Sequence, residues 1–219
     1  MNVFIIIPAF NEEPRLMSTI MSVIALNKYT VVVVDDGSSD STYTIASSLV
    51  TTLRHSVNRG MGAALSTGTE YALSSGADSI VHFDADGQHR ADEIDRFVKV
   101  LEADQADIVL GSRYLQKNQL PRTKKYLIHK PAVLFQNITA RIRLTDVHNG
   151  FRAMNRLAAN KIRIRQDRMA HASEIIYEIK RNRLRYCEVP VTIAYREYGQ
   201  GIQDGLKIFG DLIRKKFLK

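Results

Sequence analysis

Acidic residues stand directly after three separate apolar runs of this 219-residue chain. They form the segments Asn11-Glu12-Glu13, Asp35-Asp36-Gly37 and Asp84-Ala85-Asp86-Gly87-Gln88. If the runs are strands of one parallel sheet, their carboxyl ends meet at one edge, and the carboxylates there repel one another. A cation, or the hydrogen-bond donors of a ligand, relieves that repulsion. These residues therefore predict a site for a hard divalent cation and an oxygen-rich ligand such as a diphosphate.

The Asp84-x-Asp86 pair is the sharpest of these signals. The spacing alone is weak, because it also occurs in ordinary surface turns, but here it ends a buried strand and is followed by Gln88 and His89. We predict that Asp84, Asp86 and Gln88 hold Mg²⁺ or Mn²⁺, with His89 next to the ligand shell. Asp86 is then also a catalytic residue, because the cation it holds neutralises charge on a departing diphosphate.

The elements that must position these residues follow a regular rhythm over the first 110 residues. Short apolar, β-branched runs alternate with helical patterns of 10–15 residues, which predicts a doubly wound α/β fold with a mostly parallel sheet covered on both faces. The expected strands are 3–7, 31–34, 53–57, 79–83 and 107–110, and the expected helices are 13–26, 40–50, 61–74 and 92–102.

The second half of the chain loses this rhythm, although no linker divides it from the first. The pattern predicts helices over 132–142, 173–180 and 204–218, and short strands over 151–154, 185–188 and 191–195. In the last helix, one stripe is apolar and the opposite side is basic, which is typical of a helix lying at a membrane interface, or of one packed on the core or on a partner.

Charge separates the two halves as well. Residues 1–110 contain 7 Lys and Arg against 15 Asp and Glu, whereas residues 111–219 contain 24 against 8. The basic half predicts an anionic partner: a phospholipid surface, a phosphorylated substrate or nucleic acid, unless it is only a solvated surface. The aromatic-interleaved patterns of nucleic-acid stacking modules are absent, so we expect no nucleic-acid partner.

The sequence lacks two common nucleotide-binding patterns. Gly60, Gly62 and Gly68 do not have the G-x-G-x-x-G spacing of a dinucleotide fold, and no P-loop pattern is present.

The single Cys187 fits a reducing compartment, and the first residues lack the pattern of a signal peptide. We therefore expect a cytoplasmic protein, bound peripherally at the inner face of the membrane.

The motifs, taken in order, resemble the inverting glycosyltransferases of family 2 with a GT-A fold, and most of all the dolichyl- or polyprenyl-phosphate sugar synthases. The matching segments are Pro8–Glu12, Val34–Ser38, Asn58–Gly62, Asp84–His89, Gly111–Tyr114, Asp146–Arg152 and Glu188–Val191 leading to Arg196. The chain departs from the family at Arg90-Ala91, where prolines are usual, at Asn149, and at Gly199-Gln200-Gly201 after Arg196.

The resemblance implies a single domain, 1–219, and a role for each motif. Residues 1–112 form a nucleotide-binding half, 113–203 an acceptor half and 204–219 the amphipathic helix. The metal ligands are those named above, and the acceptor loop contributes His148, Asn149, Gly150 and Arg152. The nucleotide-binding residues are Pro8, Ala9, Phe10, Glu12, Asp35, Asp36, Gly60, Asp84, Ala85, Arg113 and Arg196.

Transfer of a sugar from a nucleotide diphosphate sugar to a lipid phosphate is the predicted reaction. A phosphate monoester is mostly dianionic at pH 7 and attacks without a protein base, whereas a sugar hydroxyl needs a carboxylate, for which Asp146 and Glu174 are the catalytic candidates. Transfer to a sugar hydroxyl during polysaccharide or glycolipid assembly is the alternative, and a nucleotidyltransferase or a nucleotide-sugar sensor is more remote. A small membrane protein could supply the anchoring.

Overall fold

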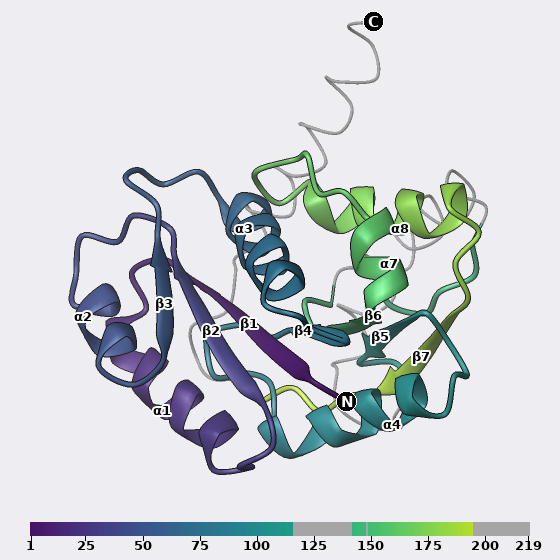
Figure 1. Ribbon diagram of the computed structural model, residues 1–219, viewed down its shortest axis with the longest axis horizontal. Coiled ribbons are helices and arrows are strands. Elements are labelled where there is room, and N and C mark those ends of the chain that lie inside the picture. Colours follow the sequence, from purple (N-terminus) through teal and green to yellow (C-terminus); the bar gives the residue numbers. More distant parts are fainter. Residues whose placement is uncertain (116–141, 148, 195–219) are drawn as a thin grey trace, which may run out of the picture.

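A computed structural model describes residues 1–115, 142–147 and 149–194, and its core is a seven-stranded sheet (Figure 1). The strands lie in the order β3-β2-β1-β4-β6-β5-β7. All pairings are parallel except those of β6 with its two neighbours, β4 and β5. The strands are β1 (Val3–Ala9), β2 (Thr30–Asp35), β3 (Thr51–Arg54), β4 (Ser79–His82), β5 (Ile108–Ser112), β6 (Arg152–Asn155) and β7 (Tyr186–Pro190).

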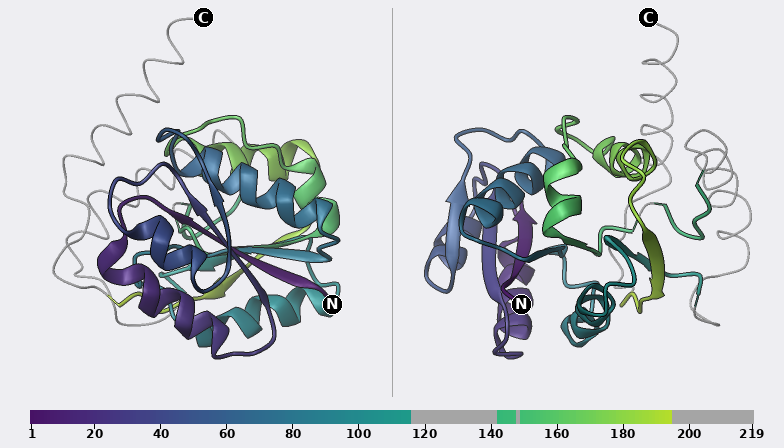
Figure 2. Two further views of the ribbon diagram at one scale, coloured as in Figure 1. Left: turned by 60° about the vertical axis from the view of Figure 1, so that its left-hand side comes forward. Right: turned by 45° about the vertical axis from the view of Figure 1, so that its right-hand side comes forward.

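Helices cover both faces of this sheet, as Figures 1 and 2 show. One face carries α1 (Glu13–Ile24), α2 (Thr42–Ser47) and α4 (Ile94–Glu102), the last preceded by a short 3₁₀ turn, Ala91–Glu93. The other face carries α3 (Met61–Ser74), α7 (Arg156–Lys161) and α8 (His171–Arg181). The predicted doubly wound, mostly parallel architecture is thereby confirmed.

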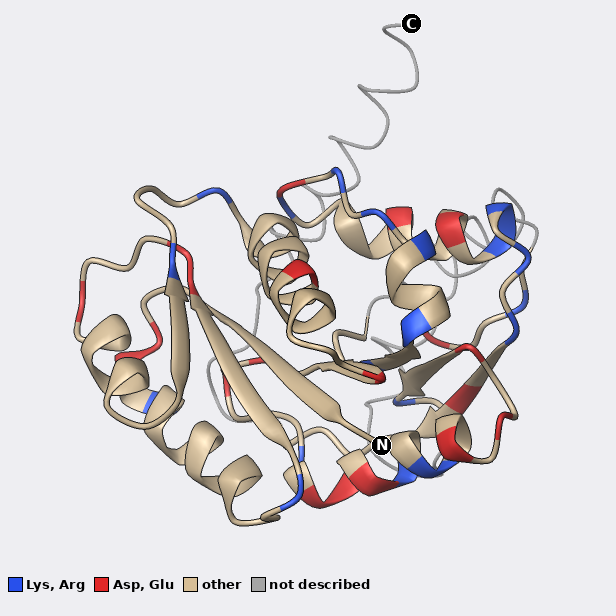
Figure 3. Ribbon diagram, in the orientation of Figure 1, with Lys and Arg blue, Asp and Glu red and all other residues tan. Residues whose placement is uncertain are grey.

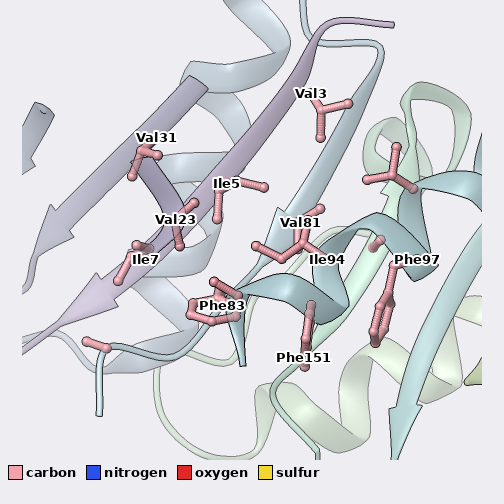
Figure 4. Packing of buried hydrophobic residues seen from close by; sticks show 14 of the residues in the cluster. Val3, Ile5, Ile7, Val23, Val31, Val81, Phe83, Ile94, Phe97 and Phe151 are labelled. Carbon is pink, nitrogen blue, oxygen red and sulfur yellow. The ribbon is translucent and has the colours of Figure 1, made fainter. Parts of the chain in front are cut away.

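The two-residue period of a strand explains why β1 supports both layers. Val3, Ile5 and Ile7 belong to the core on the α1 and α4 side, while Phe4 and Ile6 belong to the core under α3. Every residue of β1 is consequently buried, which is why its sequence reads as one continuous apolar run. Figure 4 shows the first of these cores, where Phe97 stacks on Phe151 with ring centroids 4.1 Å apart.

The antiparallel strand β6 decides where the second half of the chain meets the first. His82 of β4 pairs with Arg152 of β6, and Leu110 of β5 pairs with the same residue from the other side. Because β6 runs in the opposite direction, its first residues lie at the edge where β1, β2, β4 and β5 end. The segment that precedes β6 is thus delivered to the rim that carries the acidic motifs.

The structure adds to some of the predicted helices, and other predictions fall outside the described residues. Helix α7 was not predicted, and α8 begins at His171 rather than Ser173. The expected helix 204–218 and nearly all of 132–142 lie outside the described residues. Across residues 1–115, 142–147 and 149–194, no helix combines the length and apolar character needed to span a bilayer. The division of the domain into halves remains a prediction.

Candidate active site

The ends of β1 and β2 are tied together at the rim by hydrogen bonds. The backbone N–H of Asp36 donates to Ala9 O at 2.8 Å, and that of Glu12 donates to Thr42 Oγ1 at 2.8 Å. Pro8 and Ala9 are buried, whereas Phe10 exposes 44% of its surface and Glu12 is half-buried against Arg15. The buried backbone thus fixes an exposed ring and a carboxylate at the mouth of the rim, where a nucleoside could be held.

Asp35 and Asp36 are adjacent but have different surroundings. Asp35 is fully buried; its Oδ1 accepts from the backbone N–H of Ser38, and its Oδ2 lies 3.0 Å from Arg54 Nε. Asp36 accepts from the backbone N–H groups of Arg59 at 3.0 Å and Gly60 at 2.6 Å. The Asp36 carboxylate therefore shapes the 58–60 loop.

His55 completes this arrangement. Its Nδ1 lies 2.6 Å from Asp36 Oδ1 and its Nε2 lies 3.0 Å from Thr67 Oγ1 on α3. Gly60 itself has φ +109°, and a Cβ there would lie 2.5 Å from Asp167 O, so only glycine fits. The predicted residue Gly60 is thus needed for the close approach of two loops.

The Asp84–Gln88 loop is held in place from both sides. Thr19 on α1 donates to Ala85 O at 3.0 Å, and Ala85 is buried. The backbone N–H of Gln88 donates to Asp86 Oδ1 at 2.9 Å. His89 Nε2 lies 3.1 Å from Asp84 Oδ2, and its place next to a metal's ligand shell stays a prediction.

The two carboxylates of this loop differ in their electrostatics. Burial opposes ionisation of Asp84, but its hydrogen bond with His89, followed by the charges of His89, Arg152 and His171, holds its pKa below the usual value. Burial raises the pKa of Asp86, and the neighbouring charge of Asp84 raises it further. The repulsion expected from the sequence is present, and a bound cation would relieve it.

The donor set suits a cation that is only partly enclosed by protein. In the part of the chain that the structure describes, no three His, Cys, Asp or Glu side chains gather as a complete metal cage. Asp84 and Asp86, with the amide of Gln88, would instead leave positions open for diphosphate and water oxygens. That pattern fits Mg²⁺ or Mn²⁺, which keep several non-protein ligands.

The predicted acceptor segment meets the Asp84 carboxylate directly. A Cβ at Gly150 would lie 2.2 Å from Asp84 Oδ2 and 2.5 Å from Oδ1, so the backbone of Gly150 rests against the carboxylate. Asn149 is buried, and its Oδ1 accepts from the backbone N–H of Phe151 at 2.8 Å. The structure thus brings together two motifs that are more than 60 residues apart in the chain.

Asp146 forms an ion pair with Arg113. Arg113 Nε and Nη2 donate to the two Asp146 oxygens at 2.6 and 2.8 Å, and Asp146 is only 3% exposed. Glu188 on β7 holds the same segment, because it accepts from the backbone N–H groups of Thr145 and Asp146 at 2.9–3.0 Å. Asp146 thereby fixes the position of the Arg113 side chain at the end of β5.

Arg152 lies beneath the rim. It is 3% exposed, and burial lowers its pKa against the opposing charges of Asp84 and Asp146. Its Nη1 is buried with no hydrogen-bond partner among the described residues. Two buried histidines share this region: burial lowers the pKa of His82 to about 3 and that of His171 to about 4, with Arg152 adding to both shifts. The positive charge of Arg152, beneath the rim, thus favours the ionised form of the Asp84 carboxylate.

Glu174, the other candidate base, supports a loop. Its Oε2 accepts from the backbone N–H groups of Arg165 at 2.8 Å and Gln166 at 2.9 Å. That loop in turn packs on α3, where Ala63 N–H donates to Asp167 O at 3.1 Å. Glu174 therefore fixes the loop that packs against α3.

The segment after β7 runs beside the acidic loop. His89 forms an isolated antiparallel bridge with Ile193, and Ala194 N–H donates to Gln88 O at 2.9 Å. This pairing places the chain up to Ala194 beside the acidic loop, and Arg196 and His148 lie outside the described residues. Their assignments to the nucleotide and the acceptor remain predictions.

Several supporting residues were missed by sequence reasoning. Thr19, His55 and Glu188 act through contacts to segments distant in sequence, so no local spacing marks them. Glu188 had one usable signal, since it opens a Glu-Val-Pro-Val segment that the family resemblance includes.

Comparisons with known proteins show which family this chain is similar to. The family model described as "Glycosyl transferase family 2" matches residues 4–163. A UDP-N-acetylglucosamine–dolichyl-phosphate N-acetylglucosaminyltransferase from Methanococcus voltae is 31% identical over 99% of this chain and 97% of its own length. A polyprenol monophosphomannose synthase from Mycolicibacterium smegmatis is 29% identical over 93% of this chain and 82% of its own.

A solved structure has the same fold at low sequence identity. Glucosyl-3-phosphoglycerate synthase from Mycobacterium tuberculosis, crystallised with Mn²⁺, uridine diphosphate and phosphoglyceric acid, superimposes with a TM-score of 0.75. It is 15% identical, and the match covers 100% of this chain and 79% of the other. Together with the sheet order, this confirms the GT-A fold.

Proposed function

Because the chain belongs to glycosyl transferase family 2, we propose that it transfers a sugar from a nucleotide diphosphate sugar to a polyprenyl phosphate. The relatives above are named for transfer to dolichyl phosphate or polyprenol phosphate, and they match nearly the whole chain. The observation that carries the proposal is the contact of Gly150 with the Asp84 carboxylate, because it joins the donor motif to the acceptor segment.

The residues divide the work between donor and acceptor. Phe10 and Asp35 lie at the ends of β1 and β2, where the nucleoside would bind. Asp84, Asp86 and Gln88 would hold Mg²⁺ or Mn²⁺, which when bound neutralises charge on the leaving diphosphate. Arg113, fixed by Asp146, offers a guanidinium to an anionic substrate at the end of β5.

The hydrogen bonds that the candidate bases Asp146 and Glu174 already accept support a phosphate acceptor. Both Asp146 oxygens accept hydrogen bonds from Arg113, and Glu174 accepts from two backbone N–H groups. A sugar hydroxyl needs a carboxylate to take its proton, whereas a phosphate dianion attacks the anomeric carbon unaided. A single in-line displacement with inversion then requires only that the chain orient the two substrates.

The test is direct transfer to a short-chain polyprenyl phosphate. Protein, Mn²⁺ or Mg²⁺ and one of GDP-mannose, UDP-glucose or UDP-N-acetylglucosamine are incubated with the lipid, and the product is read by mass spectrometry. We expect a lipid-linked sugar with at least one donor, and none with the Asp86→Asn variant. Absence of product with all three donors refutes the acceptor assignment. Transfer to a sugar hydroxyl instead would establish the alternative.

A peripheral membrane position follows from a lipid acceptor. The described residues contain no spanning helix. Because the proposed acceptor is a membrane lipid, the proposal places the rim against the inner face of the membrane, with or without a small membrane protein as anchor. A nucleotidyltransferase or a nucleotide-sugar sensor is disfavoured by the family match. Release of diphosphate from a nucleoside triphosphate would support the former.

A further inference from the structure

Two exposed loops next to the rim form a basic surface that the transfer reaction does not use. The first is the 56–59 loop, with Val57 64% exposed and Arg59 exposed. The second is the 163–169 loop, where Arg163, Arg165 and Arg168 are exposed and Met169 is 38% exposed. We call these two segments the basic loops.

The two basic loops lie side by side. Arg59 Nη2 is 3.8 Å from Asp167 Oδ1, and a Cβ at Gly60 would lie 2.9 Å from Arg168 Cγ. The backbone of the first loop is tied to Asp36 through Arg59 N–H, so the basic loops are continuous with the rim. Figure 3 shows them at the top of the molecule, while α4, which carries both acidic and basic residues, lies along the opposite side.

The local sequence explains why the arginines point outward. In Ile162-Arg163-Ile164-Arg165 the isoleucines pack into the core under α3 and α8, and the alternate arginines are left exposed. The polar backbone is turned inward as well, because Glu174 accepts from Arg165 N–H and His171 Nδ1 lies 2.8 Å from Arg168 O. The loop is therefore fixed through its backbone and its isoleucines, while its cationic side chains remain available.

We propose that the basic loops are the surface by which this protein docks on anionic phospholipid. Four exposed guanidinium groups stand against two exposed carboxylates, Asp167 and Glu70, of which Glu70 lines a pocket together with Arg163 and Arg165, so the surface keeps a positive excess. Exposed Val57 and Met169 add apolar side chains that can enter the headgroup region, a combination typical of interfacial binding. The inference rests on the proposed function, since a lipid acceptor requires the rim to approach a membrane.

The test compares two variants that each remove two positive charges from exposed side chains. Arg163→Gln with Arg165→Gln alters the basic loops, whereas Lys28→Gln with Lys99→Gln alters the far side: Lys28, which pairs with Asp95, lies in the turn between α1 and β2, and Lys99 lies on α4. Binding is measured by sedimentation of the full chain with vesicles of phosphatidylcholine alone, or of an equimolar mixture with phosphatidylglycerol.

We expect binding only to the vesicles that contain phosphatidylglycerol. Each basic residue near such a surface contributes about 5-fold in partitioning, so the Arg163 and Arg165 variant should bind roughly 30-fold more weakly, and the Lys28 and Lys99 variant should bind like the wild type. Raising the salt from about 0.1 M to about 1 M shortens the screening length from about 10 Å to about 3 Å, and should weaken wild-type binding.

Three results would overturn the proposal: equal binding by the two variants, wild-type binding that ignores phosphatidylglycerol, or a preference of the basic loops for a nucleic-acid duplex over vesicles. Transfer to a short-chain polyprenyl phosphate without vesicles separates this proposal from the proposed function. If the wild type and the Arg163 and Arg165 variant transfer equally while neither binds vesicles, only the docking surface is wrong. If vesicles bind but no sugar is transferred, the reaction assignment is wrong and the surface stands.

Discussion

Acid should destabilise this fold well above the pH at which its carboxylates titrate, and His171 should account for a measurable part of the loss. His171 is 2% exposed, and burial, reinforced by Arg152, lowers its pKa to about 4 from an ordinary value of 6.5. The unfolded chain therefore takes up a proton near pH 6.5, and the folded chain only near pH 4. Stability is complete above pH 6.5 and is lost as the pH falls through this window.

The size of the effect follows from the two pKa values. Between about pH 7 and about pH 5 this one histidine should lower the free energy of unfolding by about 2 kcal/mol. His82, whose pKa burial lowers to about 3, contributes a similar amount in the same direction. Since a domain is typically stable by about 5–15 kcal/mol, the two together remove a large fraction of its stability.

The assay is urea unfolding of the wild type and His171→Gln at both pH values. The loss of stability between them should be smaller in the variant by about 2 kcal/mol, whatever its stability at pH 7. The raised pKa values of Glu12, Asp86 and Glu188 act in the opposite sense, but they largely cancel in this comparison. Tyr177→Gln, at a 43% exposed position on the same helix, is the control and should behave like the wild type. Equal losses in wild type and His171→Gln would refute the reasoning.

Three further substitutions probe the site. Gly150→Ala should lower turnover roughly 100-fold, because its Cβ would displace the Asp84 carboxylate by about an ångström; unchanged kcat would contradict this. Glu174→Ala should lower Tm by roughly 5 °C, because two hydrogen bonds to the 165–166 backbone are lost. Glu174→Gln keeps an acceptor and should retain most turnover. If Glu174→Gln is inactive, Glu174 acts as a base. Asp86→Asn should raise Tm by relieving repulsion from Asp84, yet abolish the Mn²⁺-dependent thermal shift with nucleotide; a retained shift would exclude Asp86 as a ligand.

The sequence was sufficient for the strands of the first half and for the edge where the acidic motifs meet. Runs such as Val31–Val34 are apolar at every position, which only a strand buried on both faces tolerates, and parallel strands end at one edge of their sheet. The placement of Asp84 and Asp86 beyond β4 followed from that rule alone.

The strand pairing and side-chain contacts of the second half could not be predicted from the sequence in the same way. That β6 inserts antiparallel between β4 and β5 depends on long-range pairing, and no local pattern announces it. The helix α7, only six residues long, lacks the periodicity that identifies longer helices. The roles of Asp146 and Glu174 were equally hidden, because a carboxylate reads the same in sequence whether it is open to substrate or already bound to Arg113 or to a loop backbone.

What the sequence determined by itself was therefore the chemistry available: acidic residues after buried strands, a basic second half, and motifs whose order resembles one family. What only the tertiary structure decided was which of these groups meet. Gly150 touches Asp84, Asp36 closes on the 58–60 loop, and Arg152 is buried under the rim because β6 carries it there. Residue type and spacing are local properties, whereas contacts across 60 residues of chain are fixed by how the whole sheet packs.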